Sequence, residues 1–152
     1  MKTRSAPTQF GILTLTEEDG SLIRLGWGPA PHEDVSDLLD SAVAQLSAYD
    51  KGELDAFDLP LRVAGSPLQK AVCAAMSAIP LGETRTYGDI AKDVKASAQA
   101  VGQACGGNPI PIIIPCHRVM GANGKLTGFS GAGGVETKVA LLRHEHAAGL
   151  LI

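Results

Sequence analysis

The sequence has few of the features that would assign it to a class at once. Its three cysteines are unevenly spaced, and it contains no CxxC pair, no HExxH motif and no cysteine–histidine cluster with zinc-ligand spacing. We therefore expect neither a disulfide framework nor a metal, and we expect a reducing, cytoplasmic setting. No apolar run approaches the ~20 residues of a membrane helix. The basic first residues are not followed by the apolar stretch of a secretory signal.

Positive charge is also scarce. The net charge of −3 is unusual for a nucleic-acid-binding protein until the chain is divided. Residues 1–84 carry six basic and twelve acidic side chains, and residues 85–152 carry seven basic and four acidic ones. Any contact with a polyanion is therefore expected in the second half. With 152 residues, 45% of them apolar, the chain is long enough to bury a core.

The first part of the chain has the pattern of a small mixed subdomain. Two alternating stretches, Phe10–Thr16 and Ser21–Trp27, flank an acidic turn ending in glycine and predict a β-hairpin. Apolar residues recur at helical spacing over Asp34–Tyr49, which predicts a helix. A proline-containing connector follows, and we place a boundary near Ala64. The predicted organisation is a hairpin-plus-helix subdomain over residues 1–64 and a second domain over residues 65–152.

The second part is predicted to be mostly helical. Ser66 and Pro67 are typical of an N-cap and a first helical residue, and Thr86 with Asp89 resembles a capping box. Four helices are predicted, at about residues 67–79, 86–93, 98–105 and 135–146. The two short middle helices have the outline of a helix-turn-helix. The fold class is therefore α/β of the α+β kind.

The segment before Cys116 is the most informative part of the sequence. Prolines 109, 111 and 115 bracket the apolar run Ile110–Ile114, which predicts a buried, extended stalk that presents Cys116. A thiol has a pKa of about 8.5 and needs a base to become a nucleophile. His117 is adjacent, and Glu145 is the candidate carboxylate to orient it. Cys73 and Cys105 are expected to be ordinary buried side chains.

The run Pro115-Cys116-His117-Arg118-Val119 resembles the active-site signature of O6-alkylguanine-DNA alkyltransferases. The similarity extends in ordered segments over residues 66–147. The N-terminal part resembles the family only in outline, and it lacks the Cys and His ligands with which some members bind zinc. The resemblance implies direct-reversal DNA repair, in which an alkyl group passes once and irreversibly from guanine O6 to Cys116. It implies no cofactor, a monomer, and a helix-turn-helix similar to a winged helix.

The resemblance also implies roles for the residues around Cys116. His117 takes the thiol proton through a bound water, Glu145 polarises His117, and Asn108 holds the turn between the second helix of the helix-turn-helix and the active-site segment. Tyr87 crowds the phosphate 3′ of the lesion and donates to the base, and Ser130 contacts the O6 side. The carbonyls of Cys116 and Val119 accept from the guanine amino group. Because the thiol is buried, the damaged base must flip out of the duplex.

The helix over residues 98–105 is faced with small side chains, which suits close approach to the minor groove of double-stranded DNA. These residues are Ser97, Ala98, Ala100, Gly102 and Ala104. Gln99 stands where the family usually has the arginine that fills the gap left by the flipped base. We therefore expect weaker duplex binding or slower flipping. Arg118 is expected either to anchor its loop or to contact phosphate.

Three other functions are compatible with parts of this pattern. A non-catalytic lesion-binding protein of the alkyltransferase-like type usually lacks the acceptor cysteine, and only Gln99 favours it. A cysteine hydrolase would use Cys116 and His117, but adjacent partners are unusual for such a dyad and no oxyanion-hole motif is present. A helix-turn-helix transcription factor would need more base-reading side chains than Gln99 and Gln103 supply.

Overall fold

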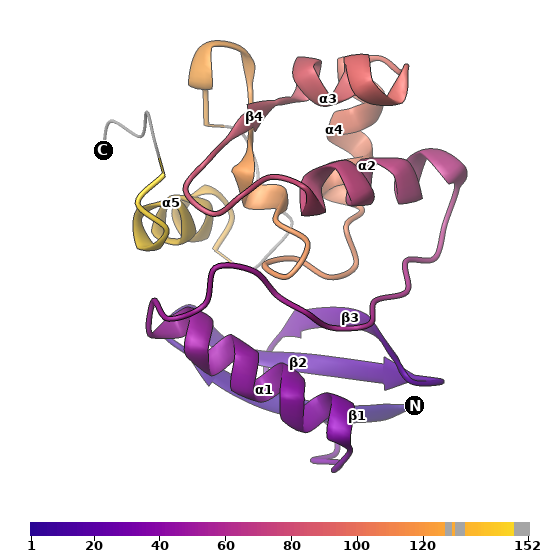
Figure 1. Cartoon of the computed structure of the whole chain (residues 1–152), viewed down its shortest axis with the longest axis vertical. Coiled ribbons are helices and arrows are strands. Elements are labelled where there is room, and N and C mark those ends of the chain that lie inside the picture. The colour runs from indigo at the N-terminus through magenta and orange to yellow at the C-terminus, as the bar shows by residue number, and fades with distance from the viewer. Residues whose placement is uncertain (127–128, 130–132, 148–152) are drawn as a thin grey trace. The chain divides into compact units, whose positions relative to one another are not determined.

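The computed structural model describes the chain except for residues 127–128, 130–132 and 148–152 (Figure 1). It divides into two compact units, Met1–Val63 and Ala64–Ile152. Among the described residues, no helix is both long and apolar enough to cross a membrane.

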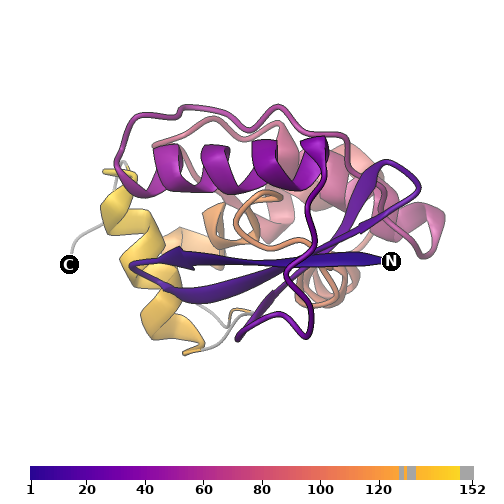
Figure 2. The ribbon, with the colours of Figure 1, turned by 90° about the horizontal axis from the view of Figure 1, so that it is seen from below.

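The first unit is a three-stranded antiparallel sheet with one helix packed on it (Figures 1 and 2). The strands are β1 (Lys2–Thr8), β2 (Gly11–Glu18) and β3 (Ser21–Trp27), paired in that order, and the helix is α1 (Asp37–Asp50). Leucines 13, 15, 25, 39 and 46 from the sheet and helix are buried and form the core. The unit therefore has the expected hairpin and helix, with one further strand.

The hairpin prediction is confirmed, but the turn is tighter than expected and β1 was not predicted. The turn consists of Asp19 and Gly20, both at positive φ (50° and 78°), as a two-residue hairpin turn requires. Strand β1 is an edge strand in which Ala6 is the one buried residue and Pro7 is tolerated. Because its apolar alternation is so weak, its sequence does not look like a strand.

In its described residues, the second unit contains four α-helices and a pair of very short parallel strands. Its elements are α2 (Pro67–Ser77), β4 (Arg85–Thr86), α3 (Tyr87–Val94), α4 (Ala98–Gly106), η1 (Cys116–Arg118), β5 (Val119–Met120), η2 (Ala122–Gly124) and α5 (Val135–His144). Ser66 caps α2, and Thr86 with Asp89 forms a reciprocal capping box at the start of α3. Both predicted caps are confirmed, and with them the α+β fold class.

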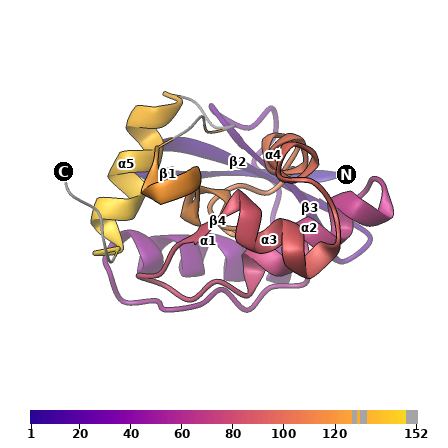
Figure 3. The same cartoon turned by 90° about the horizontal axis from the view of Figure 1, so that it is seen from above.

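Helices α3 and α4 have the expected helix-turn-helix connection. They are joined by residues 95–97, where Lys95 adopts the left-handed conformation (φ 58°) and Ser97 caps α4. Viewed from above, α4 is seen nearly end-on while α3 lies across the view (Figure 3). The similarity to a winged helix stays a prediction.

The predicted extended stalk over Ile110–Ile114 is wrong in shape, although the segment is buried as expected. The Ile114 N–H donates to the Ile110 carbonyl at 2.8 Å, and Ile112 has a φ of +73°, so the segment closes a tight turn. Pro109 and Pro111 have no N–H to give to a neighbouring strand. The Ile110 and Ile114 N–H groups are satisfied locally, by Asn108 Oδ1 and by the Ile110 carbonyl.

Candidate active site

Cys116 begins the short helix η1 directly after this buried turn, and its own N–H donates to the Ile114 carbonyl at 2.8 Å. The side chain is buried, as are Cys73 and Cys105, and none of the three forms a disulfide. Burial raises the pKa of Cys105 to about 12 and also raises that of Cys73. Neither of these two thiols ionises near neutral pH, as expected for ordinary core cysteines.

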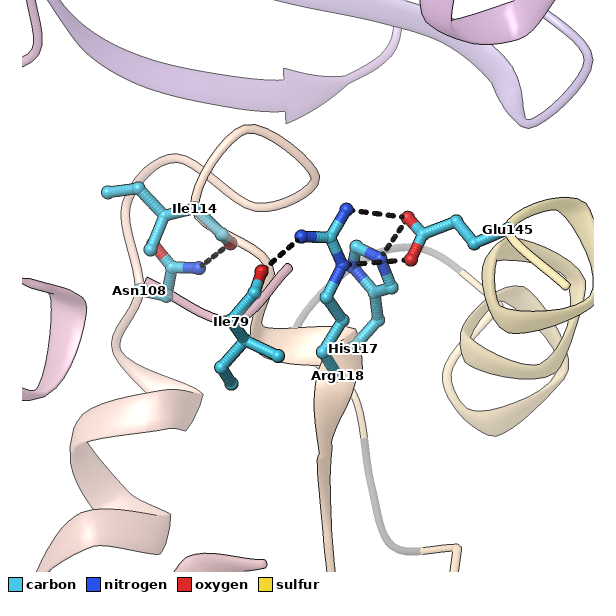
Figure 4. A network of polar contacts seen from close by, with 6 residues as sticks. All are labelled: Ile79, Asn108, Ile114, His117, Arg118 and Glu145. Atoms are coloured by element: carbon cyan, nitrogen blue, oxygen red, sulfur yellow. Dashed lines mark hydrogen bonds and ion pairs between the residues drawn. The ribbon is translucent and has the colours of Figure 1, made fainter. Parts of the chain in front are cut away.

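The two residues after Cys116 meet Glu145 inside the protein (Figure 4). His117 Nε2 lies 2.6 Å from Glu145 Oε2, with both side chains fully buried. Arg118 donates to the same carboxylate from Nε (2.8 Å) and Nη2 (3.2 Å), and its Nη1 donates to the Ile79 carbonyl at 2.6 Å. The network therefore links η1, α5 and the end of α2.

Burial and charge set the protonation of this network. Burial alone would raise the pKa of Glu145, but hydrogen bonds and charges from His117 and Arg118 lower it to about 2. Burial lowers the pKa of His117; Glu145 opposes this, and the Arg118 and Lys138 cations reinforce it. Arg118 donates to both oxygens of Glu145, so the carboxylate stays ionised beside a neutral imidazole.

These protonation states determine which nitrogen of His117 carries the proton. An ionised carboxylate can only accept, so Nε2 must donate to Glu145 and the lone pair must lie on Nδ1. His117 Nδ1 is buried and has no hydrogen-bond partner among the described residues. A buried acceptor without a partner is uncommon and calls for an explanation. Here it leaves an available base on the residue next to Cys116.

Asn108 joins α4 to the Cys116 turn. Its Nδ2 donates to the Ile114 carbonyl at 2.8 Å, and its Oδ1 accepts from the Ile110 N–H at 3.0 Å (Figure 4). The side chain is buried, so both bonds are shielded from water. Asn108 therefore ties both ends of the turn that precedes Cys116.

Lys138 is a buried residue of the site that the sequence reasoning missed. Its side chain is fully buried on α5, its Nζ donates to the Val119 carbonyl at 2.6 Å, and it lies 6.0 Å from the centre of the Tyr87 ring. Burial lowers its pKa, and the Cys116 and Cys105 thiols oppose that lowering. Lys138 lies three residues before Leu141, four before Leu142 and seven before Glu145, which places it on the same face of the helix. A charged residue on this apolar face was the signal in the sequence that could have identified Lys138.

The residues expected to contact DNA lie mainly on α3 and α4. Tyr87 is the first residue of α3 and is half-buried. On α4, Ser97, Ala98 and Gln99 are exposed, while Ala100 and Gly102 are half-buried. Arg118 and the Val119 side chain are buried, and the engagement of Arg118 with Glu145 favours the anchoring role. Ser130 lies outside the described residues.

Residues 67–147 of the chain match a family described as "6-O-methylguanine DNA methyltransferase, DNA binding domain". The chain belongs to this family. A methylated-DNA–protein-cysteine methyltransferase from Mycolicibacterium paratuberculosis is 43% identical over 93% of this chain and 90% of its own length. One of the same name from Methanosarcina acetivorans is 55% identical over 68% of this chain and 67% of its own length.

The family fold extends over both units. The structure titled Mycobacterium tuberculosis OGT in complex with DNA matches 95% of this chain and 92% of its own length, with a TM-score of 0.85 and 43% identity. The family resemblance and the fold class read from the sequence are thus confirmed. Among the described residues of this alkyltransferase, no group of three or more His, Cys, Asp or Glu side chains is placed to hold a metal ion.

Proposed function

We propose that this protein repairs DNA by transferring an alkyl group once, from O6 of guanine to its own Cys116. The observation that carries the proposal is the buried, unpartnered Nδ1 of His117, on the residue next to the thiol. Glu145 and Arg118 hold the imidazole in the tautomer that makes Nδ1 a base. Membership of the family supplies the substrate class.

In the transfer, the Cys116 proton moves to His117 Nδ1 through a bound water. The thiolate attacks the alkyl carbon, a C–S bond forms, and the bond between that carbon and O6 breaks. The electron pair stays on the guanine, which takes up a proton from the Tyr87 hydroxyl; the imidazolium then returns a proton to Tyr87. The cysteine proton is thus passed on balance to guanine, and a leaving group neutralised in this way departs more readily.

Each molecule reacts once under this mechanism. Once alkylated, Cys116 is a thioether that cannot form a thiolate, so it cannot attack again, and burial raises the pKa of both Cys73 and Cys105. The protein therefore acts stoichiometrically. No cofactor is required, because the bond to guanine already activates the alkyl group.

The damaged base is flipped out of double-stranded DNA bound through the minor groove. The small, solvent-facing side chains at the start of α4 permit close approach, and Gln99 is placed among them to occupy the gap in the duplex. The carbonyls of Cys116 and Val119 accept from the guanine amino group. Lys138 fixes the Val119 carbonyl from inside the protein, which orients it before the base arrives. The protein acts as a monomer.

The proposal is tested by measuring the intact mass of the protein after incubation with a duplex that contains O6-methylguanine. We expect each molecule to gain one methyl group in place of one hydrogen, with a plateau at one equivalent of lesion. The Cys116→Ser variant should gain none. An unchanged mass with the lesion duplex still bound would instead identify a non-catalytic damage sensor, the alternative that Cys116 disfavours.

A further inference from the structure

Gln69 on α2 has a polar side chain that no step of the proposed transfer uses. It is the third residue of the helix, and its backbone N–H donates to the capping hydroxyl of Ser66 at 3.1 Å. Its side chain is half-buried and directed at α4: Nε2 donates to the Ala104 carbonyl at 2.8 Å and lies 3.5 Å from Cys73 Sγ. A side chain from one helix thus bonds the backbone of another.

The bond reaches α4 at the end that leads to the active site. Ala104 is in the last turn of α4, where carbonyls lack the partners that the helix interior provides. The Ala104 carbonyl also accepts from the Gly107 N–H at 3.2 Å, so Gln69 completes the C-terminal cap. Asn108, which holds both ends of the Cys116 turn, is the next residue after Gly107.

Gly107 shows how closely the amide of Gln69 is seated. Its φ of −91° is open to any residue, so backbone conformation does not require glycine here. A Cβ at this position would lie 3.2 Å from Gln69 Oε1, whereas its other neighbours would be at 3.6 Å or more. The amide therefore bonds Ala104 on one side and occupies the space beside Gly107 on the other.

We propose that Gln69 is a positioning residue for transfer from DNA. Its amide fixes the C-terminal end of α4 to α2. This holds the side of α4 that contacts DNA in a constant position relative to the turn between Asn108 and Cys116. The inference rests on the proposed function and adds to it a residue that contacts neither DNA nor the reacting atoms. Its loss should weaken transfer from a duplex without changing the intrinsic reactivity of the thiol.

The first test compares two reactions of Cys116 in Gln69→Leu, which keeps the bulk of the side chain, and in Gln69→Glu, which replaces the donor by a carboxylate. The second-order rate of methyl transfer from an O6-methylguanine duplex should fall about three- to tenfold, the effect of one lost hydrogen bond. The rate of Cys116 alkylation by iodoacetamide, which needs no DNA, should stay that of the unchanged protein.

Gln45→Leu is the matched control. Within the first unit, Gln45 Nε2 donates to the Asp58 carbonyl at 3.0 Å and its Oε1 accepts from the Asp58 N–H at 2.8 Å, so this glutamine also bonds backbone of another segment. Gln45→Leu should lower the melting temperature at least as much as Gln69→Leu and leave both rates unchanged. Equal losses of the duplex and iodoacetamide rates in the Gln69 variants, or no loss in either, would overturn the inference and leave the proposed function intact. Absence of transfer by the unchanged protein would refute both.

A double-mutant cycle with Gly107→Ala tests the contact itself. Gly107→Ala alone should slow duplex transfer, because the new methyl group displaces the Gln69 amide from Ala104. In the Gln69→Ala background the same change should cost little, since the obstructing atom is gone. Additive effects would show that the two positions act independently and would overturn the proposal.

Discussion

Glu145→Gln is the substitution whose cost the structure defines best. The pKa of Glu145 falls from 4.5 to about 2 in the folded protein. At about 1.4 kcal/mol per pKa unit, the ionised carboxylate contributes about 3 kcal/mol to the free energy of unfolding. The amide keeps the shape but leaves the buried guanidinium of Arg118 without a counter-charge, a loss that typically costs about 3–5 kcal/mol. Glu145→Gln is therefore expected to destabilise the protein by about 3 kcal/mol at pH 7.

The dependence on pH distinguishes this charge effect from a simple loss of packing. A lowered carboxyl pKa stabilises the fold fully above pH 4.5, and the contribution disappears as the pH falls through about 2. The difference between the unchanged protein and Glu145→Gln should therefore be about 3 kcal/mol at pH 7 and roughly 1 kcal/mol at pH 3, measured by urea unfolding. Glu136→Gln, at an exposed position of the same helix, should change stability by less than about 1 kcal/mol. An equal difference at both pH values would refute the reasoning.

Three further substitutions probe other parts of the site. Asn108→Ala removes two buried hydrogen bonds at the Cys116 turn, so we expect a loss of about 2–3 kcal/mol in urea unfolding and slower Cys116 alkylation; an unchanged alkylation rate would contradict the tie between Asn108 and Cys116. Lys138→Met removes a buried cation that interacts with Cys116, so the iodoacetamide rate should fall at pH 7 and its pH profile should move to higher pH; an unmoved profile would exclude this influence. Gln99→Arg should tighten duplex binding and steepen its salt dependence by about one charge, with iodoacetamide reactivity unchanged. Equal duplex affinities of the unchanged protein and of Gln99→Arg would remove the reason for expecting a weak duplex complex.

Local signals in the sequence predicted the parts of the structure that depend on neighbouring residues. Ser66 and Thr86 bond N–H groups three residues ahead, so a capping pattern is sufficient to find them. The same holds for the helix-turn-helix, whose two helices are separated by three residues. His117 and Glu145 pair although they are 28 residues apart in the sequence. This pairing was predicted from the adjacency of Cys116 and His117 together with the family resemblance.

The missed features depend on contacts that local pattern does not encode. Strand β1 exists because β2 offers it an edge, whereas its own residues are mostly polar. The turn over Ile110–Ile114 forms because Asn108 binds both of its ends, which overrides the β-preference of its four isoleucines. The role of Lys138 depends on a carbonyl 19 residues away. For Lys138 the deciding partner lies far along the chain, whereas Asn108 lies only two and six residues from the groups that it bonds.

The surroundings of Cys116 favour the proposed reaction at this thiol over the other two buried ones. Burial alone suppresses ionisation, as the pKa of about 12 for Cys105 shows. Cys116 differs by having a neutral imidazole with an available lone pair on the next residue, whereas the buried ammonium of Lys138 interacts with both Cys116 and Cys105. Glu145, which bonds the imidazole, and Lys138, which carries the ammonium, lie seven residues apart on one face of α5. Met120, Leu142 and Ala147 pack that helix against β5. The proposed reactivity of Cys116 therefore depends on the packing of a helix that does not contain it.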